Sequence, residues 1–586
     1  MEIRGIRLHR HPAIDLSALV GALAVAFLFL RLAGAHAVHL PIPAVTPRFD
    51  PDSAFLDARI LSEGFGNRVT GSDGARYAAT YLAAQLGTLG LAASTQEFPI
   101  VVKDRLLQGR NVVAVSRGTV PGTIVLVAHY DGQPTSDQSA GDNASGVGTM
   151  LELARVLERR GHRHTIAYVA TDAEEWGLVG AQTYAGSLRE PGQVVAAISF
   201  DHVENGVGKA VVIHGEGQDD DDYAPVWLRR ATTDAYAAGG VRTTDIGTLD
   251  ELIHRVLGVT MTDQGAFIDA EVPAVDLDVE SRRPDYARFL YHTPGDRWET
   301  LKPQSFALLG QGAERLVLAL DAAPAPAPHG PVHYLGLGDE RMVRGFWILL
   351  AAIALFVPLA FATWEAWTAA LADPAARTAI RSELVRAGGW WLTGIAGLLA
   401  LWAAVAVGML PQYQASPATV RDPLLYSTRW LPVVTTLLIM VLVGVLLNSL
   451  RKRSGLEVSH PLSGRVAALS TLAVVVALTL LHNPFAAVWL LVLPAWLWPW
   501  IGPTRRPLTS AGGLLIVAAS AVPLVVALVV MSRPLEVGSG LLWYLFLQAA
   551  YATWSPFTTV TLVVMVLAAT RLLGTATARL LPAEGD

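Results

Sequence analysis

The chain has 586 residues, a formal net charge of −6 at pH 7 and no cysteine. Disulfides and thiolate metal sites are therefore excluded, so a metal ion would have to bind to His and carboxylate side chains. The mild charge and the lack of a basic stripe argue against nucleic acid as a partner. The length exceeds one ordinary domain, and residues 345–573 are mostly Leu, Val, Ala and Trp.

The first apolar run extends from Ile14 to Leu32, and it follows three arginines, Arg4, Arg7 and Arg10. Positive charge before an apolar run holds that end in the cytoplasm. We therefore expect residues 1–39 to be a cytoplasmic N-terminus with a first transmembrane helix, and the next segment to be extracytoplasmic. Ala35-His36-Ala37 has the pattern of a signal-peptidase site, so cleavage of the first helix stays open.

Residues 40–325 have the mixed charge and the Gly and Asp content of a soluble domain. Helical spacing of apolar residues predicts helices over 75–89 and 146–159. Short β-rich runs predict strands over 111–115, 123–128, 165–170, 194–200, 210–213 and 274–279. Strands that alternate with helices indicate an α/β sheet with helices on both faces. In such a sheet the loops at the carboxyl ends of the strands form the functional site.

Potential metal ligands follow three of these strands: His129, the adjacent Glu174 and Glu175, and Asp201. A neutral imidazole binds zinc, and Asp131 is placed to hold the other ring nitrogen of His129. Two adjacent carboxylates repel each other unless cations or a proton share the site. In a metal site, one of the two glutamates binds the metal and the other takes a proton from metal-bound water.

Two further candidates lie in loops. Asp142 precedes the predicted helix over 146–159, where its carboxylate either bridges two metals or caps the helix. His292 lies in a turn with Tyr291 and Pro294, which would fix its imidazole. We expect a structural role for His202, and surface or core roles for His162, His164, His214 and His254. The acidic run from Asp219 to Asp222 is expected to be a solvated loop.

The alternating Pro and Ala residues from Pro324 to Pro328 predict a stiff connector within a linker over 326–344. Residues 345–586 are expected to form an all-α transmembrane domain of about seven helices. The predicted spans are 345–367, 389–410, 430–450, 464–482, 485–501, 511–531 and 540–573, the last kinked or re-entrant near Ser555-Pro556. Basic loops after the first, third and fifth of these spans put the C-terminus inside. The span interiors carry almost no ionisable residue, which argues against a transporter.

Five segments, in this order, resemble the motifs of the co-catalytic two-zinc aminopeptidases of peptidase family M28. They are His129-Tyr130-Asp131, Asp142-Asn143-Ala144-Ser145-Gly146, Glu174-Glu175-Trp176-Gly177-Leu178-Val179-Gly180-Ala181, Asp201 and Tyr291-His292-Thr293-Pro294-Gly295-Asp296. The resemblance spans residues 50–320. One anchor followed by many spans is similar to the membrane-bound branch of the family, which includes endoplasmic reticulum metallopeptidase 1. The resemblance implies a mixed central sheet flanked by helices, the zinc-aminopeptidase fold.

The resemblance also implies two Zn²⁺ ions per chain and a role for each motif residue. His129 and Asp201 would bind one zinc, Glu175 and His292 the other, and Asp142 would bridge them. Glu174 would be the general base, Tyr291 would stabilise the oxyanion, and Asp131 would orient His129. The segment Thr262-Asp263-Gln264 departs from the S-D-H of many relatives, which leaves the substrate specificity open.

The sequence therefore predicts a membrane-anchored di-zinc metallopeptidase that hydrolyses peptide substrates by a zinc-bound hydroxide, with aminopeptidase action favoured over carboxypeptidase action. A single-zinc enzyme like glutaminyl cyclase and a non-catalytic, peptidase-like binding module stay alternatives. High Ala, Gly and Arg contents favour a bacterial source, and hence a multi-pass protein of the bacterial membrane with a periplasmic or extracellular catalytic domain. The physiological substrate, the oligomeric state and the role of the transmembrane domain stay open.

Overall fold

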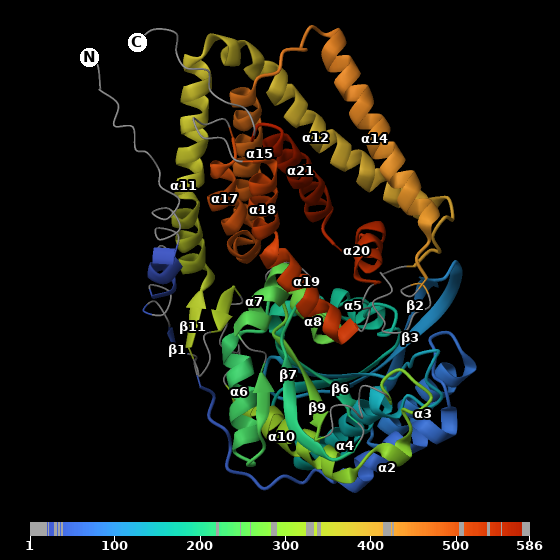
Figure 1. Ribbon diagram of the computed structural model, residues 1–586. Coiled ribbons are helices and arrows are strands. Elements are labelled where there is room, and N and C mark those ends of the chain that lie inside the picture. Colours follow the sequence, from blue (N-terminus) through green and yellow to red (C-terminus); the bar gives the residue numbers. More distant parts are fainter. Residues whose placement is uncertain are drawn as a thin grey trace.

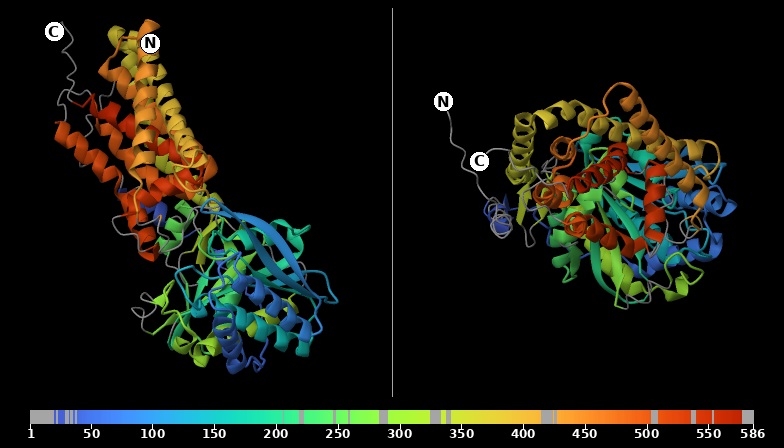
Figure 2. Two further views of the ribbon diagram at one scale, coloured as in Figure 1. Left: turned by 90° about the vertical axis from the view of Figure 1, so that its right-hand side faces the viewer. Right: turned by 45° about the horizontal axis from the view of Figure 1, so that its top comes forward.

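The structure is a computed structural model. It describes residues 20–21, 23–28, 32, 35–36, 39–204, 206–217, 222–245, 248–257, 260–282, 290–323, 333–336, 341–413, 424, 427–502, 509–535, 540–552 and 554–576. An α/β half and a helical half are stacked end to end (Figure 1; Figure 2, left). Much of the first predicted span, Ala37 of the possible cleavage site, the segment Pro324 to Pro328 and Asp219 to Asp221 lie outside the described residues.

An eight-stranded mixed sheet forms the centre of the α/β half, in the order β2-β3-β5-β4-β6-β9-β7-β8. Neighbouring strands are parallel from β5 through β4 and β6 to β9, and β7 is antiparallel to β9. The strands are β2 (Ala93–Val102), β3 (Arg105–Ser116), β4 (Thr123–His129), β5 (Thr165–Thr171), β6 (Val194–Val203), β7 (Gly208–His214), β8 (Thr243–Asp245) and β9 (Ala274–Ser281). All six strands that the β-rich runs predict are present, several of them longer than expected.

Helices cover both faces of the sheet. On one side α4 (Ser145–Arg160) and α10 (Pro303–Ala322) pack on the central strands, and α2 (Pro51–Phe65) packs on both of these helices. On the other side α5 (Val179–Gly186) and α8 (Gln264–Asp269) pack together, between the sheet and the helical half (Figure 1). The remaining helices of this half are α3 (Asp73–Thr88), α6 (Val226–Ala237) and α7 (Thr248–Leu257).

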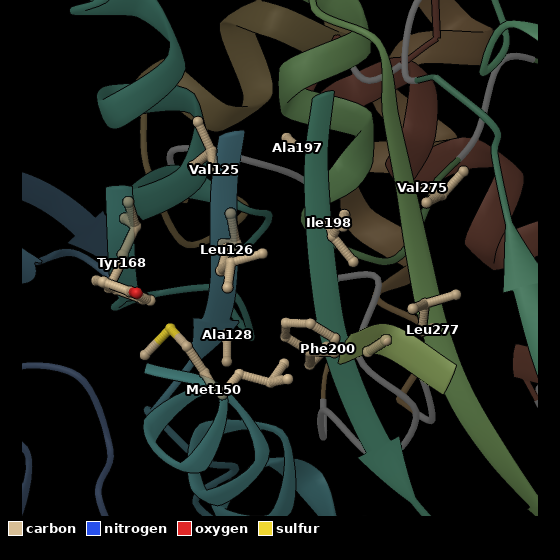
Figure 3. Close-up of a cluster of buried hydrophobic side chains, with 14 of the residues drawn as sticks. Val125, Leu126, Ala128, Met150, Tyr168, Ala197, Ile198, Phe200, Val275 and Leu277 are labelled. Carbon is tan, nitrogen blue, oxygen red and sulfur yellow. The ribbon is translucent and has the colours of Figure 1, made fainter. Parts of the chain in front are cut away.

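The core lies between the sheet and α4. The side chains of Ala128 on β4, Phe200 on β6 and Met150 on α4 pack together there (Figure 3). All three are fully buried. Because the strand ends are anchored in this way, the residues that follow β4, β5 and β6 are held on a rigid base.

The helical half contains six helices long and apolar enough to cross a membrane among the residues the structure describes. They correspond to α11 (Gly345–Ala372), α12 (Pro374–Ala406), α14 (Trp430–Arg453), α15 (Pro461–His482), the pair α18 (Ser510–Ser520) and α19 (Val522–Leu535), and α21 (Pro556–Leu573). This half is a multi-pass, all-helical region of the kind that spans membranes.

Two predicted spans differ from single helices. Residues 485–501 form the short pieces α16 (Pro484–Ala486), η4 (Ala487–Leu491), α17 (Val492–Leu497) and η5 (Trp498–Trp500). Residues 540–573 break into α20 (Leu541–Ala550) and α21, which begins at Pro556. The proline lacks a backbone N–H and fits at the first turn of a helix but not in its interior, so the helix restarts there.

Residues 334–344 of the predicted linker hold two short strands, β10 (Tyr334–Gly336) and β11 (Arg341–Arg344). Strand β11 pairs with β10 and with β1 (Ala35–His36), which adjoins the first apolar run. The two ends of the α/β half therefore meet in one small sheet beside the helical half.

The two halves also touch through side chains. The Asn483 amide, between α15 and α16, donates a hydrogen bond of 2.7 Å to the carbonyl oxygen of Arg255 in α7. The backbone N–H of Gln412, after α12, donates to the carboxylate of Asp104 at 2.7 Å, and Asp104 N–H donates back to Gln412 O at 3.1 Å. Loops at one end of the helical half thus rest on the α/β half.

Candidate metal centre

The loops at one edge of the sheet gather two imidazoles and four carboxylates. His129 is the last residue of β4, Glu174 and Glu175 follow β5, and Asp201 is part of β6. The strands β4, β5 and β6 are adjacent and parallel, so their carboxyl ends meet at the same edge. Asp142 comes from η1 (Ala140–Ala144), and His292 comes from the turn after residue 290.

These six side chains form two buried groups, one of His129, Glu174 and Asp201 and the other of Asp142, Glu175 and His292. Nε2 of His129 lies 3.3 Å from Oδ1 of Asp201, and Nε2 of His292 lies 3.4 Å from Oε2 of Glu175. Asp142 connects the two groups: its Oδ1 lies 3.2 Å from Nε2 of His129 and its Oδ2 lies 2.7 Å from Nε2 of His292. Each oxygen of one carboxylate thus faces a different imidazole.

The segment around Asp142 is fixed by its own neighbours. The Asn143 side chain donates to the carbonyl oxygen of Phe200 at 2.8 Å and accepts from the N–H of Gly146 at 2.8 Å. The Ser145 hydroxyl accepts from the N–H of Val203 at 3.0 Å. A side chain at Gly146 would place its Cβ 2.2 Å from the Phe200 oxygen. Asn143, Ser145 and Gly146 of the D-N-x-S-G motif therefore hold the Asp142 loop against β6.

The turn that carries Glu174 and Glu175 is tied to the loop after β4. The backbone N–H groups of Glu174 and Glu175 donate to the two carboxylate oxygens of Asp131 at 3.1 and 3.3 Å. The same carboxylate lies 3.4 Å from Nδ1 of His129. Asp131 therefore lies beside His129, and it also fixes the neighbouring turn, which the sequence did not indicate.

His292 is placed by the segment that follows it. Asp296 accepts from the N–H groups of Gly141 and Asp142 at 2.7 and 3.2 Å, which joins the His292 turn to the Asp142 loop. The ring of Tyr291 stacks on the His292 ring with 3.7 Å between centroids and lies 5.1 Å from the ring of His202. Tyr291 is half-buried, beside the centre.

Burial and mutual repulsion perturb the carboxyl groups. Burial, and next the charge of Asp142, raise the pKa of Glu175 to about 8. Burial also raises the pKa of Glu174 well above its ordinary value, with Glu175 adding to the rise against the opposing effect of His129. Burial raises the pKa of Asp142 too, but its contacts with the two imidazoles outweigh this and lower the pKa strongly. Such a concentration of buried acids calls for positive charge between them.

The donor set fits a pair of zinc ions. Zinc binds imidazole nitrogen and carboxylate oxygen, and each of the two buried groups offers one imidazole and two carboxylates. Oε1 of Glu175 is buried and has no hydrogen-bond partner, whereas its Oε2 accepts from the amide of Gln133 at 2.5 Å. A buried, unpartnered carboxylate oxygen is costly, and a bound cation would satisfy it. The two groups are thus consistent with a binuclear site.

Arg68 supports this centre although no motif points to it. Its guanidinium is fully buried and donates to the carbonyl oxygens of Tyr130, Gln138 and Ser139 at 2.6, 2.8 and 2.8 Å. These carbonyls lie at the two ends of the one loop that joins His129 to the Asp142 segment. Burial lowers the pKa of Arg68 to about 10, against the charge of Asp296. One cation therefore holds together the two ends of the loop between His129 and Asp142.

Residues 262–264, where the sequence departs from the S-D-H of many relatives, lie beside the candidate metal centre. The Asp263 carboxylate is buried and accepts from the Thr171 hydroxyl at 2.5 Å, and burial raises its pKa to about 7. The Gln264 amide donates to the carbonyl oxygen of Glu216 at 3.2 Å. Of the histidines with expected surface or core roles, His164 is buried in the core, and His214 lies in a further cluster described below.

The fold and the site define a class of protein. An α/β domain carries two buried groups of potential metal ligands at one edge of its sheet, and a multi-pass helical region follows it. The family described as Peptidase family M28 matches residues 111–317, which include all six clustered side chains. The comparisons thus support a peptidase M28 domain in this part of the chain, followed by a multi-helix apolar region.

Individual relatives match parts of the chain. The alkaline phosphatase isozyme conversion protein of Escherichia coli is 31% identical over 165 residues, which are 24% of this chain and 48% of the relative. Aminopeptidase YwaD of Bacillus subtilis is 28% identical over 192 residues, 32% of this chain and 39% of the relative. The chain thus spans half the length of these relatives or less. A solved glutaminyl cyclase of Porphyromonas gingivalis is 24% identical with a TM-score of 0.40, over 46% of this chain and 99% of that one.

Proposed function

We propose that the protein is a membrane-anchored, zinc-dependent aminopeptidase of the M28 type. The observation that supports it most is the position of Asp142, whose two oxygens lie 3.2 and 2.7 Å from the imidazole nitrogens of His129 and His292. This is the arrangement that a carboxylate bridging two metal ions needs. The match to peptidase family M28 over residues 111–317 and the similarity to an aminopeptidase support the proposed reaction class.

In this proposal His129 and Asp201 hold one zinc, Glu175 and His292 hold the other, and Asp142 is shared. Bound zinc supplies Lewis acidity toward the scissile carbonyl and lowers the pKa of bound water to about 7. Glu174 takes the proton from the attacking water and delivers it to the leaving amine. Oε2 of Glu174 lies 3.9 Å from Nε2 of His129, farther than the carboxylates of Asp142 and Asp201. Glu174 therefore lies beside the ligand set without the closer contacts that Asp142 and Asp201 make with His129.

Tyr291 is proposed to donate its hydroxyl to the oxyanion. Burial, and next the charges of Asp142 and Glu175, raise its pKa well above 10. The phenol therefore stays protonated at neutral pH and remains a donor. Stacking on the His292 ring keeps it beside the ligand set.

The contacts between the halves support an extracytoplasmic catalytic domain. The loops predicted to lie outside, after α12 and after α15, carry Gln412 and Asn483, which bond to the α/β half. The basic run in the last turn of α14 begins at Arg451, which contacts Ser382 near the other end of α12. The positive-inside rule therefore supports an outer position for the α/β half. Assignment to the branch of endoplasmic reticulum metallopeptidase 1 is part of the same proposal.

The proposal is tested with Glu174→Gln in the full-length protein. Because the amide cannot accept the proton, we expect hydrolysis of aminoacyl reporter substrates to fall by about 10² to 10⁴, while zinc content stays unchanged. Glu63→Gln, at an exposed position of α2, is the matched control and should keep wild-type turnover. Wild-type-like activity of Glu174→Gln would contradict its role as the base.

The rival readings are separated by the product and the metal count. A peptidase shortens a peptide library from one terminus and releases free amino acids. A glutaminyl cyclase would release ammonia from peptides that begin with glutamine, shorten none of them and bind one zinc per chain. A binding module would do neither and would stay free of metal in the presence of zinc.

A further inference from the structure

A second cluster of an imidazole and two carboxylates lies on the same sheet, on strands β7 and β9. Strand β9 is next to β6, which carries Asp201. The cluster consists of His214, the last residue of β7, with Asp276 and Asp278 on β9. In the antiparallel pairing of β7 with β9, His214 is directly opposite Asp276. Residues two apart on a strand point to the same face, so Asp278 joins them on that face. None of these three residues belongs to a motif of the family resemblance.

The geometry of the cluster is that of a ligand set. One ligand atom from each of the three side chains lies within 4.8 Å of the others, and Nε2 of His214 is 2.9 Å from Oδ2 of Asp278. Asp276 is fully buried, and neither of its oxygens has a hydrogen-bond partner. Among the described ion pairs, no lysine or arginine contacts Asp276 or Asp278. A buried carboxylate in this state is costly unless a cation or a proton joins it.

The imidazole is oriented as a metal ligand is. Nδ1 of His214 lies 3.2 Å from Oε1 of Glu216, two residues along the chain, which leaves Nε2 facing the aspartates. His129 repeats this arrangement: its Nδ1 lies 3.4 Å from Asp131, also two residues on, and its Nε2 faces Asp142 and Asp201. Metal-binding histidines commonly donate their other N–H to such a carboxylate. His-x-Glu at the end of β7 therefore has the same local geometry as His-x-Asp at the end of β4.

We infer that His214, Asp276 and Asp278 bind a third divalent cation, separate from the candidate binuclear centre, with Glu216 orienting the imidazole. One nitrogen and two carboxylate ligands suit Zn²⁺ better than the all-oxygen preference of Ca²⁺ or Mg²⁺. Asp276 has no exposed surface, while His214 and Asp278 are half-buried, so the occupant in contact with all three is a small ion and not a substrate amine. The competing occupant is a proton shared by the two aspartates.

Metal counting distinguishes the cation from the proton. The full-length protein in detergent is equilibrated with Zn²⁺, freed of excess, and its zinc per chain is measured by mass spectrometry. We expect three equivalents for the wild type and two for Asp276→Asn, whose amide has the size of a protonated carboxyl group. Glu280→Gln is the control on the same strand, where the carboxylate pairs with Lys209 at 3.1 Å, and it should keep three.

Two equivalents in both the wild type and Asp276→Asn would show that the cluster holds a proton and would overturn the third site, while leaving the binuclear centre intact. Three equivalents in both would place the extra ion elsewhere and would also overturn it. A second measurement uses the wild type alone, so its result does not depend on the folding of Asp276→Asn. Anomalous diffraction at the zinc edge from wild-type crystals should give a peak between Nε2 of His214 and Asp276, and a crystal with peaks only at the binuclear centre would overturn the inference.

Discussion

The rings of Trp176 and Tyr413 lie with their centroids 6.5 Å apart, and they join the helical half to the turn that carries Glu174 and Glu175. Trp176 directly follows Glu175, whereas Tyr413 belongs to the segment after α12. Tyr413 also pairs with Val102 at the end of β2 and lies 5.5 Å from the ring of Tyr551. A loop of the helical half thus supports the back of the candidate metal centre.

Tyr413→Ala should therefore weaken catalysis from a position outside the M28 domain. An aromatic pair contributes about 0.5–1.5 kcal/mol beyond its buried area, and 1.4 kcal/mol corresponds to about tenfold in rate. We expect kcat/KM on an aminoacyl reporter to fall by up to about tenfold, with zinc still bound. Tyr77→Ala, on the exposed side of α3, is the control. Equal kcat/KM in both variants would show that the contact does not support the turn.

Arg68→Lys should destabilise the protein and release zinc. A lysine ammonium cannot reproduce the planar fork that binds the carbonyls of Tyr130, Gln138 and Ser139. Each buried carbonyl left without a donor costs about 1–3 kcal/mol. We therefore expect the free energy of unfolding, measured by thermal unfolding, to fall by about 3 kcal/mol or more. Arg76→Lys, which is exposed and bonds to Asp73 at 2.8 Å, should change little. A variant at residue 68 with wild-type stability and zinc content would refute the positioning role.

Gly180→Ala tests the packing under the Glu174-Glu175 turn. A Cβ at residue 180 would lie 2.1 Å from the carbonyl oxygen of Asp172 and 2.6 Å from Oδ1 of Asn111. Displacing backbone atoms costs free energy. The midpoint of thermal unfolding should therefore drop, and activity should fall with it. Gly186→Ala, in the same helix α5, meets nothing within 4 Å and should be neutral or slightly stabilising. Similar midpoints for the two variants would contradict this packing.

Zinc affinity should weaken as the pH falls. In the cation-free protein, burial and the charge of Asp142 hold the pKa of Glu175 at about 8. Below that pH the carboxyl group is protonated, so zinc must displace a proton to bind. We expect the apparent Kd, measured by competition with a chelator, to weaken between pH 8 and pH 6 by up to about tenfold per pH unit for each proton displaced. Equal affinities at pH 6 and pH 8 would argue against Glu175 as a ligand.

The proposed orientation can be tested with single cysteines, because the chain has none of its own. Thr80→Cys lies on an exposed face of α3, and Ser454→Cys lies in the exposed loop after α14. In intact cells a membrane-impermeant maleimide should label Thr80→Cys and spare Ser454→Cys, and both should be labelled after lysis. The opposite pattern would reverse the orientation.

Six of the eight strands of the sheet could be predicted from the sequence because each contains a short β-rich run, whereas β2 and β8 were not predicted. His129, Glu174 and Asp201 could be expected at one edge because β4, β5 and β6 are parallel, and parallel strands end together. Asp142 and His292 are loop residues, and the periodicity of apolar residues does not predict where a loop lies relative to the sheet. Their places beside His129 depend on Asp296 and on the buried cation of Arg68.

His214 is a candidate ligand that the sequence did not predict. Its spacing to Glu216 matches that of His129 to Asp131, yet the sequence alone favours a surface or core role. What makes it a candidate ligand is Asp276, 62 positions later, which lies opposite it only because β7 runs antiparallel beside β9.

The sequence by itself determined the local features: apolar periods, membrane spans and the ordered motifs of a zinc peptidase domain. These depend on neighbours along the chain, and composition and spacing record them directly. Only the tertiary structure decided which residues meet across the sheet, and that the loop with Tyr413 rests behind the Glu175 turn. Such contacts depend on strand order, register and docking, which are set by the packing of the whole chain and leave no periodic trace in any single segment.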